Sequence, residues 1–248
     1  MATNRIPAGA YLKDVRFSGP VTGGKDCVLE RCEIDAQESL YGFTCAKDAQ
    51  GRYLGATLID CVIRNADKGI LGANLRVIGT AQEAARIEDM ANDGIFAAGD
   101  NGYVSGVVFR RLGDVAMAKR IAAKKGSPYS PPHADCVQVM GFKNWKVIGN
   151  YGDVMPDAAH PVVNSFAYFE AEHGDCENCA ANGNWMNGGI YCAWAIDHRV
   201  GNVIQRQIST TVEFKNNTVF SFDKGAFQAP RMSPLVLATN NVSGARNY

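Results

Sequence analysis

The sequence predicts an all-β fold, in which short strands from a single chain (residues 1–248, one domain) stack in parallel as a single-stranded β-helix. Three observations support this prediction. Glycine is abundant, with 26 residues, and helical periodicity is nearly absent. Short β-rich runs are separated by Gly, Asn and Asp. The runs also resemble one another along the chain, which is typical of a solenoid.

The repeated runs share one pattern: a turn residue, a glycine or small residue, an apolar residue, a variable residue and a second small or apolar residue. Their spacing of roughly 22–35 residues predicts about 8–9 coils. The apolar position of each run is expected to fill the interior, as Ile70, Ile95, Val137, Ala167, Ile190 and Ala226. The runs are "ADKGILGA" (66–73), "ANDGIFAA" (91–98), "HADCVQVM" (133–140), "NSFAYFEA" (164–171, a looser match), "NGGIYCAW" (187–194) and "DKGAFQAP" (223–230).

A second set of runs closes with asparagine. Asparagines stacked at a bend can hydrogen-bond along the stack and satisfy the backbone groups of the turn. Two earlier runs, "CVLERCEID" and "TLIDCVIRNAD", align Cys32 with Cys61. The predicted asparagine column is Asn150, Asn184, Asn217 and Asn241.

One helix is expected, Val115–Lys125, inside a loop or helix insertion near 113–132. Its basic residues form either a solvated amphipathic face or a cradle for a substrate carboxylate. They are Lys119, Arg120, Lys124 and Lys125.

Composition excludes several classes of protein. Lys+Arg and Asp+Glu both number 25, so no basic surplus predicts a nucleic-acid partner. The apolar runs are too short to span a bilayer, so no membrane association is expected. The N-terminus lacks the apolar segment of a secretory signal, and an extracellular or virion-associated location would need another route. The eight cysteines are expected to be buried thiols, with no cofactor and no metal.

The pattern of repeats, from about residue 10 to 244, resembles the right-handed parallel β-helix of the pectate-lyase-like superfamily, which includes phage tailspike depolymerases. The resemblance implies a right-handed coil and activity on polysaccharides. The "NTD…DD…GHG…RIK" set of polygalacturonases and the "DPHE" element of mannuronan epimerases are absent. "PPHADCVQV" is loosely similar to the His- and Asp-containing strands of these enzymes.

Side chains alternate along a strand, so the inward residues predict an outward column. This column is rich in aromatic residues, whose faces suit sugar rings. Either it forms a binding groove, or it is covered by the insertion or by a neighbouring subunit of a homotrimer. The column reads Leu71, Phe96, Gln138, Tyr168, Tyr191 and Phe227.

The candidate catalytic residues are His133, Asp135, Tyr168, Glu170 and His173. Asp135 aligns with Asp93, Lys68 and Lys224, so it either serves catalysis or satisfies turn amides like an ordinary turn Asp. His133 has no counterpart in the other runs and follows the rigid Pro131–Pro132 pair. The candidate substrate-binding residues are Phe96, Gln138, Lys143, Glu172, Tyr191 and Arg231.

Two chemistries remain open. A lyase needs a base, a Tyr or His acid and a cation that neutralises the uronate carboxylate. A glycosidase needs two carboxylates, and Glu170 with Glu172 or with a loop acid, Asp153 or Asp157, could supply them. Asp135 and Glu170 lie about 17 Å apart on neighbouring coils, too far for such a pair.

The sequence therefore predicts a polysaccharide-degrading enzyme, a lyase or glycosidase, acting on an extended acidic polysaccharide. The alternative is a non-catalytic carbohydrate-binding or structural tailspike or adhesin module, trimeric in solution. A third hypothesis is a sugar epimerase, which would use the same groove with the catalytic acid and base at different positions.

Overall fold

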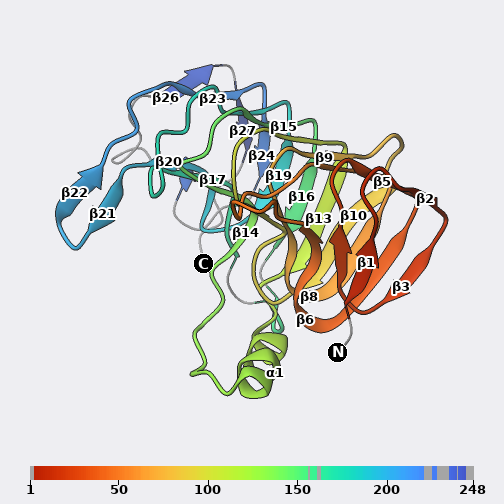
Figure 1. Ribbon diagram of the computed structural model, residues 1–248. Helices are drawn as coiled ribbons and strands as arrows, with labels where there is room; N and C mark the ends of the chain where they lie inside the picture. Colours follow the sequence, from red (N-terminus) through yellow and green to blue (C-terminus); the bar gives the residue numbers. More distant parts are fainter. Residues whose placement is uncertain are drawn as a thin grey trace.

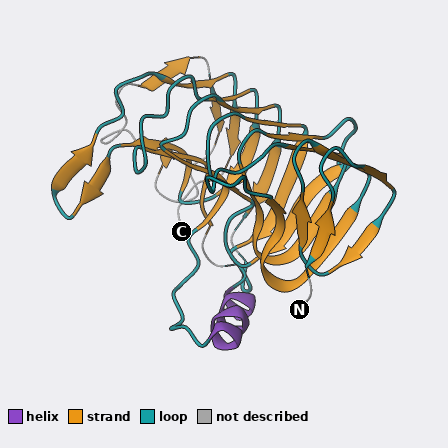
Figure 2. Cartoon of the chain, in the orientation of Figure 1, coloured by secondary structure: helices purple, strands orange, loops and turns teal. Residues whose placement is uncertain are grey.

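The computed structural model describes residues 3–155, 157–160, 163–220, 225–227, 235–238 and 240–243. For 225–227, 235–238 and 241–243 it describes the backbone alone, and for Asn240 the side chain as well. Strands account for most of this chain (Figures 1 and 2). Among the described residues, every strand pairing within the two large sheets is parallel, and the antiparallel strand pair is the hairpin of β21 (His198–Val200) with β22 (Val203–Arg206). The predicted β-rich chain with parallel pairing is confirmed.

The smaller of the two large sheets has nine strands, each paired with a strand from the neighbouring segment of the chain. In order across the sheet they are β2 (Tyr11–Lys13), β5 (Cys27–Glu30), β7 (Ala56–Ile59), β9 (Leu75–Ile78), β12 (Gly102–Ser105), β15 (Trp145–Ile148), β18 (Ala180–Asn182), β23 (Val212–Lys215) and β26 (Leu235–Ala238).

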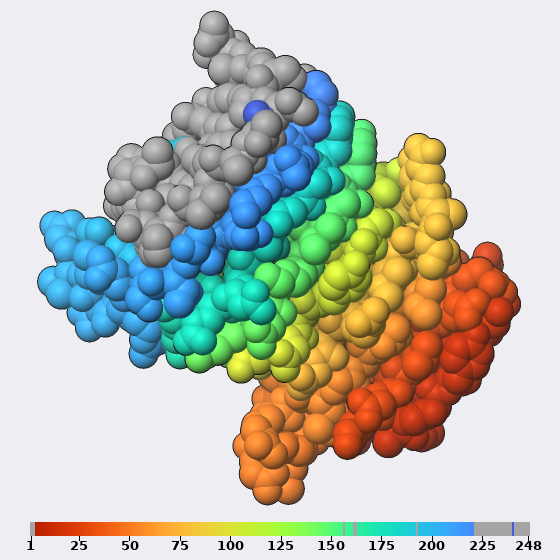
Figure 3. All heavy atoms as spheres, turned by 90° about the horizontal axis from the view of Figure 1, so that it is seen from above, coloured from red at the N-terminus to blue at the C-terminus, as the bar shows by residue number. Residues whose placement is uncertain are grey.

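The larger sheet has 16 strands in two arms, joined by the long strands β6 (Glu33–Cys45) and β8 (Val62–Gly72). The first arm continues through β1 (Asn4–Ile6), β4 (Val21–Gly23), β11 (Ile95–Ala97), β14 (Ala134–Met140), β17 (Val163–Glu170), β20 (Tyr191–Ile196) and β25 (Gly225–Phe227). The second arm continues through β3 (Arg16–Ser18), β10 (Ala85–Met90), β13 (Val107–Leu112), β16 (Tyr151–Val154), β19 (Trp185–Gly188), β24 (Thr218–Phe220) and β27 (Asn241–Ser243). In the space-filling view, successive segments form adjacent bands in sequence order (Figure 3).

One apolar core lies between the two sheets and joins side chains from both, including Phe43, Phe109 and Trp145. The predicted interior column is confirmed for four residues, which are in register and buried: Ile70, Ile95, Val137 and Ala167. Burial of such a column contributes about 25 cal/mol for each Å² of apolar surface removed from water.

The prediction is wrong for the last two positions of this column, because Ala193 and Phe227 take the register positions assigned to Ile190 and Ala226. The reason is the Gly188–Gly189 pair, whose φ angles are 93° and 94°. Gly188 ends β19 and Gly189 lies in the corner that follows, so β20 begins only at Tyr191 and its register with β17 is shifted by three residues from the alignment of repeats.

The stacked asparagines are confirmed, with one correction. Asn150 donates through Nδ2 to Oδ1 of Asn184 at 3.0 Å, and Asn184 donates to Asn217 at 3.1 Å. Asn217 continues to Asn240 at 3.1 Å, whereas Asn241 is the first residue of β27. Each of the first three side-chain amides also donates to a backbone carbonyl of an adjacent segment. We refer to Asn150, Asn184, Asn217 and Asn240 as the asparagine ladder.

A second row of asparagines was not predicted. It lies at the exposed corner before the strands of the nine-stranded sheet, and its members are Asn74, Asn101, Asn144 and Asn178. All four have positive φ, between 49° and 64°. Asn tolerates this left-handed conformation better than most residues, which explains its recurrence there.

The helix α1 (Val115–Lys125) has the predicted bounds. Asp114 caps its first turn by accepting from the Met117 amide, and Gly126, with φ of 65°, ends it. Arg120 and Lys124 both pair with Glu38 at 2.6 Å, and Lys125 lies 3.8 Å from Asp67, so three of the four basic residues already have an acidic partner. Figure 1 shows α1 standing to one side of the strands.

Seven of the eight cysteines are buried free thiols, as predicted; the side chain of Cys192 is outside the described set. No group of three or more His, Cys, Asp or Glu residues in the described chain is placed to hold a metal ion. Among these same residues, no helix has the length and apolar character needed to cross a membrane.

Candidate functional site

The first arm carries the predicted outward column, with a change at its end. Phe96 is in register with Leu71 and with Gln138, and Gln138 with Tyr168. The next member is Trp194, not Tyr191.

The shifted start of β20 causes this difference. Tyr191 is in register with Ser165, two residues before the pair of Ala167 with Ala193. Phe227 is in register with the buried Ala193. Tyr191 nevertheless stays close to the column, because its ring meets that of Trp194 edge-on at 4.9 Å.

A row of charged residues crosses the entrance of these strands. Lys68 on β8 forms an ion pair with Asp93, and Oδ1 of Asp93 accepts from the backbone N–H of Asp135 at 3.0 Å. The predicted alignment of Lys68, Asp93 and Asp135 is therefore confirmed; Lys224 lies outside the described residues. Asp93 also shows the structural use of a turn Asp, because it satisfies a backbone amide. We call these three residues the charged row.

Asp135 differs from Asp93 because one of its carboxylate oxygens accepts no hydrogen bond. Asn164 and Ser165 both donate to Oδ1, at 3.0 Å for Asn164. Oδ2 has no hydrogen-bond partner among the described residues, although the side chain is completely buried. Burial, followed by the negative charge of Asp93, raises the pKa of Asp135 well above that of a free Asp.

His133 stands in front of this carboxylate. Its Nδ1 lies 3.5 Å from Oδ2 of Asp135, within ion-pair reach and beyond a good hydrogen bond. The His133 side chain is 57% exposed, so solvent or a ligand can reach the imidazole. Such a contact can shorten when a substrate closes the site.

Tyr168 links His133 to a second acidic group. Its ring meets the His133 ring edge-on with centroids 5.9 Å apart, and its hydroxyl donates to Oε2 of Glu170 at 2.6 Å. Burial and this hydrogen bond raise the pKa of Tyr168, which keeps its hydroxyl protonated. The other oxygen of Glu170 lies 2.9 Å from Nδ1 of His198, the first residue of the β21–β22 hairpin.

A hollow of about 460 Å³ opens over the column. Five predicted residues line it: Phe96, His133, Gln138, Glu172 and His173. Lys68 also lines it and holds its ammonium 4.4 Å from the centre of the Phe96 ring. The structure thus gathers an imidazole, a cation, an aromatic ring and a carboxylate at one surface.

Other predicted residues lie elsewhere. Lys143, in the turn before β15, pairs with Glu177 at 2.6 Å and does not line the hollow. Asp153 accepts from Asn187 on the second arm, and Asp157 binds His160 in its own turn. Arg231 lies outside the described residues.

The residues of this site that were not among the predicted site residues include Lys68, Trp194 and His198. The alignment of repeats already placed Lys68 beside Asp93, so its charge was a usable signal. His198 belongs to an insertion outside the repeat, where periodicity carries no information about position.

Comparison with family models, with curated proteins and with solved structures found no match for this chain. The chemistry of the site therefore rests on its own residues. An exposed imidazole beside a buried carboxylate can accept a proton, a protonated tyrosine can donate one, and a lysine can neutralise an anion.

Proposed function

We propose that this chain is a polysaccharide-degrading enzyme, a lyase or glycosidase, acting on an extended acidic polysaccharide that lies along the first arm. The observation that carries the proposal is the exposed His133 imidazole facing the unpartnered Oδ2 of Asp135, at the rim of a hollow that also contains Lys68. Functional sites are where burial and like charge perturb the pKa of such carboxyl groups.

We also propose that the fold is a right-handed parallel β-helix of about 8–9 coils. The order of strands supports this proposal, because the chain visits the nine-stranded sheet, the second arm and the first arm in turn. The strands β12, β13 and β14 are followed in the same order by β15, β16 and β17, then by β18, β19 and β20. A stack of this kind would offer a long, straight face to a polymer.

The geometry favours elimination. His133 would remove the proton from the sugar carbon beside the uronate carboxylate, and Lys68 would neutralise the negative charge that develops on that carboxylate. The electron pair of the broken C–H bond would form a C=C bond and expel the glycosidic oxygen. Tyr168 would protonate that oxygen, because its ring adjoins that of His133; its hydroxyl would have to turn from Glu170 toward the sugar.

Hydrolysis has weaker support. It would use Glu170 and Glu172 as the carboxylate pair, and Glu172 does line the hollow. Both oxygens of Glu170, however, already have partners in Tyr168 and His198. A glycosidase would have to break these contacts before Glu170 could meet a sugar.

A panel of acidic and neutral polysaccharides tests the proposal, with the ultraviolet absorbance of unsaturated uronate and the release of reducing ends followed together. We expect both to rise on an acidic polymer and both to be lost in His133→Ala. Reducing ends without new absorbance would indicate hydrolysis and direct attention to Glu170 and Glu172. If no polymer in the panel is cleaved, the enzyme proposal fails.

The second candidate function is a non-catalytic carbohydrate-binding or structural spike module, trimeric and virion-associated or extracellular. It is favoured by the exposed apolar side chains of the β21–β22 hairpin, Val200 (61%), Val203 (60%) and Ile204 (43%), which would suit contact with another subunit. Light scattering distinguishes the two candidates: a trimer without cleavage supports the module, and an active monomer excludes it.

A further inference from the structure

Tyr151 is a half-exposed aromatic residue on the second arm, and its ring is held flat. It stacks on Trp185 of the neighbouring strand β19, with centroids 4.1 Å apart and an angle of 4° between the planes. Trp185 in turn contacts Phe220 of β24, at 5.0 Å. One face of Tyr151 is therefore covered by Trp185, yet the residue remains 39% exposed.

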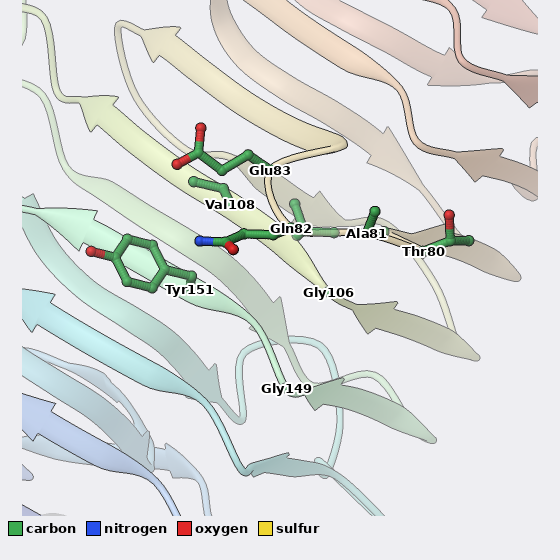
Figure 4. A pocket seen from close by; sticks show the side chains of 10 residues that line it. Thr80, Ala81, Gln82, Glu83, Gly106, Val108, Gly149 and Tyr151 are labelled. Atoms are coloured by element: carbon green, nitrogen blue, oxygen red, sulfur yellow. The ribbon is translucent and has the colours of Figure 1, made fainter.

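The rest of Tyr151 borders a second hollow, of about 430 Å³, which Trp185 does not line. The hollow lies between Tyr151 and the segment 79–83 that links β9 to β10 (Figure 4). Its volume falls within the range of roughly 300–1,000 Å³ that is typical of small-molecule sites. Gly149 borders it as well, and a Cβ at that position would meet no atom within 4 Å. The backbone there is open to a ligand.

The side chains around this hollow suit a ligand with an apolar face and polar edges. Gln82 and Glu83 are exposed, and Figure 4 shows them on the side of the hollow that faces Tyr151. An amide and a carboxylate can bind hydroxyl groups, while an aromatic ring can stack on C–H groups. A pyranose ring has both features.

The charge of the residues that line this hollow distinguishes neutral sugars from uronates. Glu83 is the one charged residue among the described residues that line the hollow, and it is negative. Arg110 lies 3.7 Å from Glu83, but its guanidinium also donates to Glu88 at 2.6 Å. Arg110 therefore neutralises Glu83 only in part, and a uronate would still be repelled by this carboxylate, so the site favours a neutral sugar.

We propose that Tyr151, Gln82 and Glu83 form a second carbohydrate site, which binds a neutral pyranose unit by stacking it against Tyr151. This site is on the second arm and shares no lining residue with the His133 hollow. It goes beyond the proposed function, because it requires neither cleavage nor an acidic substrate. Its role is to hold a glycan chain on the protein.

Titration of the whole protein with neutral hexasaccharides of glucose, xylose and mannose tests this proposal by calorimetry and by NMR saturation transfer. We expect one of them to bind, and Tyr151→Ala to weaken binding about tenfold or more because the stacking surface is lost. Tyr151→Phe keeps the ring and is expected to stay within about threefold of the parent protein. A hexagalacturonate is expected to bind the Tyr151 hollow more weakly than the neutral probe.

Since Tyr151 also packs on Trp185, the exposed Gln82→Ala variant serves as a second test that does not disturb the stack; we expect binding about threefold weaker. His133→Ala must leave this binding unchanged, which separates the two sites. The proposal is overturned if none of the neutral probes binds at millimolar concentration, or if Tyr151→Ala and Gln82→Ala both bind the probe as the parent does. It survives a complete absence of cleavage, which would overturn only the proposed function.

Discussion

The asparagine ladder and the charged row differ in the hydrogen-bond partners of their polar atoms. The side chains compared are all buried: Asn150, Asn184 and Asn217 in the ladder, and Asp93 and Asp135 in the charged row. In the ladder, the side-chain amides of Asn150, Asn184 and Asn217 each donate to the next asparagine and to a backbone carbonyl, and their oxygens accept from the preceding asparagine or from a backbone amide. In the charged row, Lys68 neutralises Asp93, but Oδ2 of Asp135 has no such partner.

Rows of aligned side chains can thus stabilise the fold, as in the asparagine ladder, or form a reactive site, as we propose for the charged row. A neutral amide has as many donors as acceptors, so a stack of amides can satisfy itself indefinitely. A carboxylate only accepts, so a stack of carboxylates needs donors or cations from elsewhere. Asp135 lacks them on one oxygen, and the exposed His133 stands at that oxygen. The unsatisfied position is therefore the one we connect with function.

The largest expected effect is on catalysis. Asp135→Asn keeps the shape of the side chain and replaces the carboxyl group that faces Nδ1 of His133 with an amide, so the imidazole loses its acidic partner and we expect cleavage to fall on the order of 10³-fold. The initial rate on the cleaved polymer measures this. Asp153→Asn is a matched control, because Asp153 is exposed on the second arm and accepts from Asn187. Equal rates for Asp135→Asn and the parent protein would remove Asp135 from the mechanism.

The next effect concerns stability. Asn184→Ala removes one rung of the ladder. The backbone N–H of Asn150 loses its acceptor, the carbonyl of Val147 loses the donated side-chain bond, and Oδ1 of Asn217 loses one of its two donors. We expect the free energy of unfolding to fall by about 3 kcal/mol, measured by chemical denaturation. Asn178→Gly, in the exposed second row, keeps the positive φ and should lower stability by less than about 1 kcal/mol. Similar losses in both variants would mean that burial of the ladder contributes nothing special.

A smaller effect is the pH dependence of stability. The folded state raises the pKa of Asp135 above its unfolded value of about 3.9, because burial opposes ionisation. The stability associated with the neutral carboxyl is thus fully present below about pH 4 and is lost as the pH rises through the folded pKa. Asp135→Asn stays neutral, so we expect its stability advantage over the parent to appear above pH 4 and to grow with pH. Denaturation curves that stay parallel across this range would contradict the assignment.

The smallest effect is expected at Lys143. Its pairing with Glu177 is exposed, and such pairs contribute little to stability. Lys143 also lies outside the hollow. We expect Lys143→Ala to change neither the midpoint of unfolding nor the rate of cleavage, as measured by thermal denaturation and the polymer assay. A clear loss of cleavage would show that the substrate extends past the hollow to the turn before β15.

The repeats in the sequence were sufficient to predict the β-rich fold and the parallel pairing, and the helical pattern of the insertion predicted the helix at Val115–Lys125. They were also sufficient for the asparagine ladder as far as Asn217, since turn residues recur at a regular spacing. The alignment failed at residues 187–194, where Gly188 and Gly189 could belong either to a strand or to a corner. Periodicity does not distinguish these two, and a shift of three residues reverses which side chains face outward.

The sequence alone was enough to predict the repeated β-rich runs and the residues that can carry protons, because both follow from local pattern and residue chemistry. Which of those residues meet depends on the tertiary packing. His133 lies just before β14 and Tyr168 lies on β17, and His198 reaches Glu170 from an insertion with no repeat. The unpartnered oxygen of Asp135 is likewise a property of packing, since it depends on every donor that neighbouring strands do or do not bring to it.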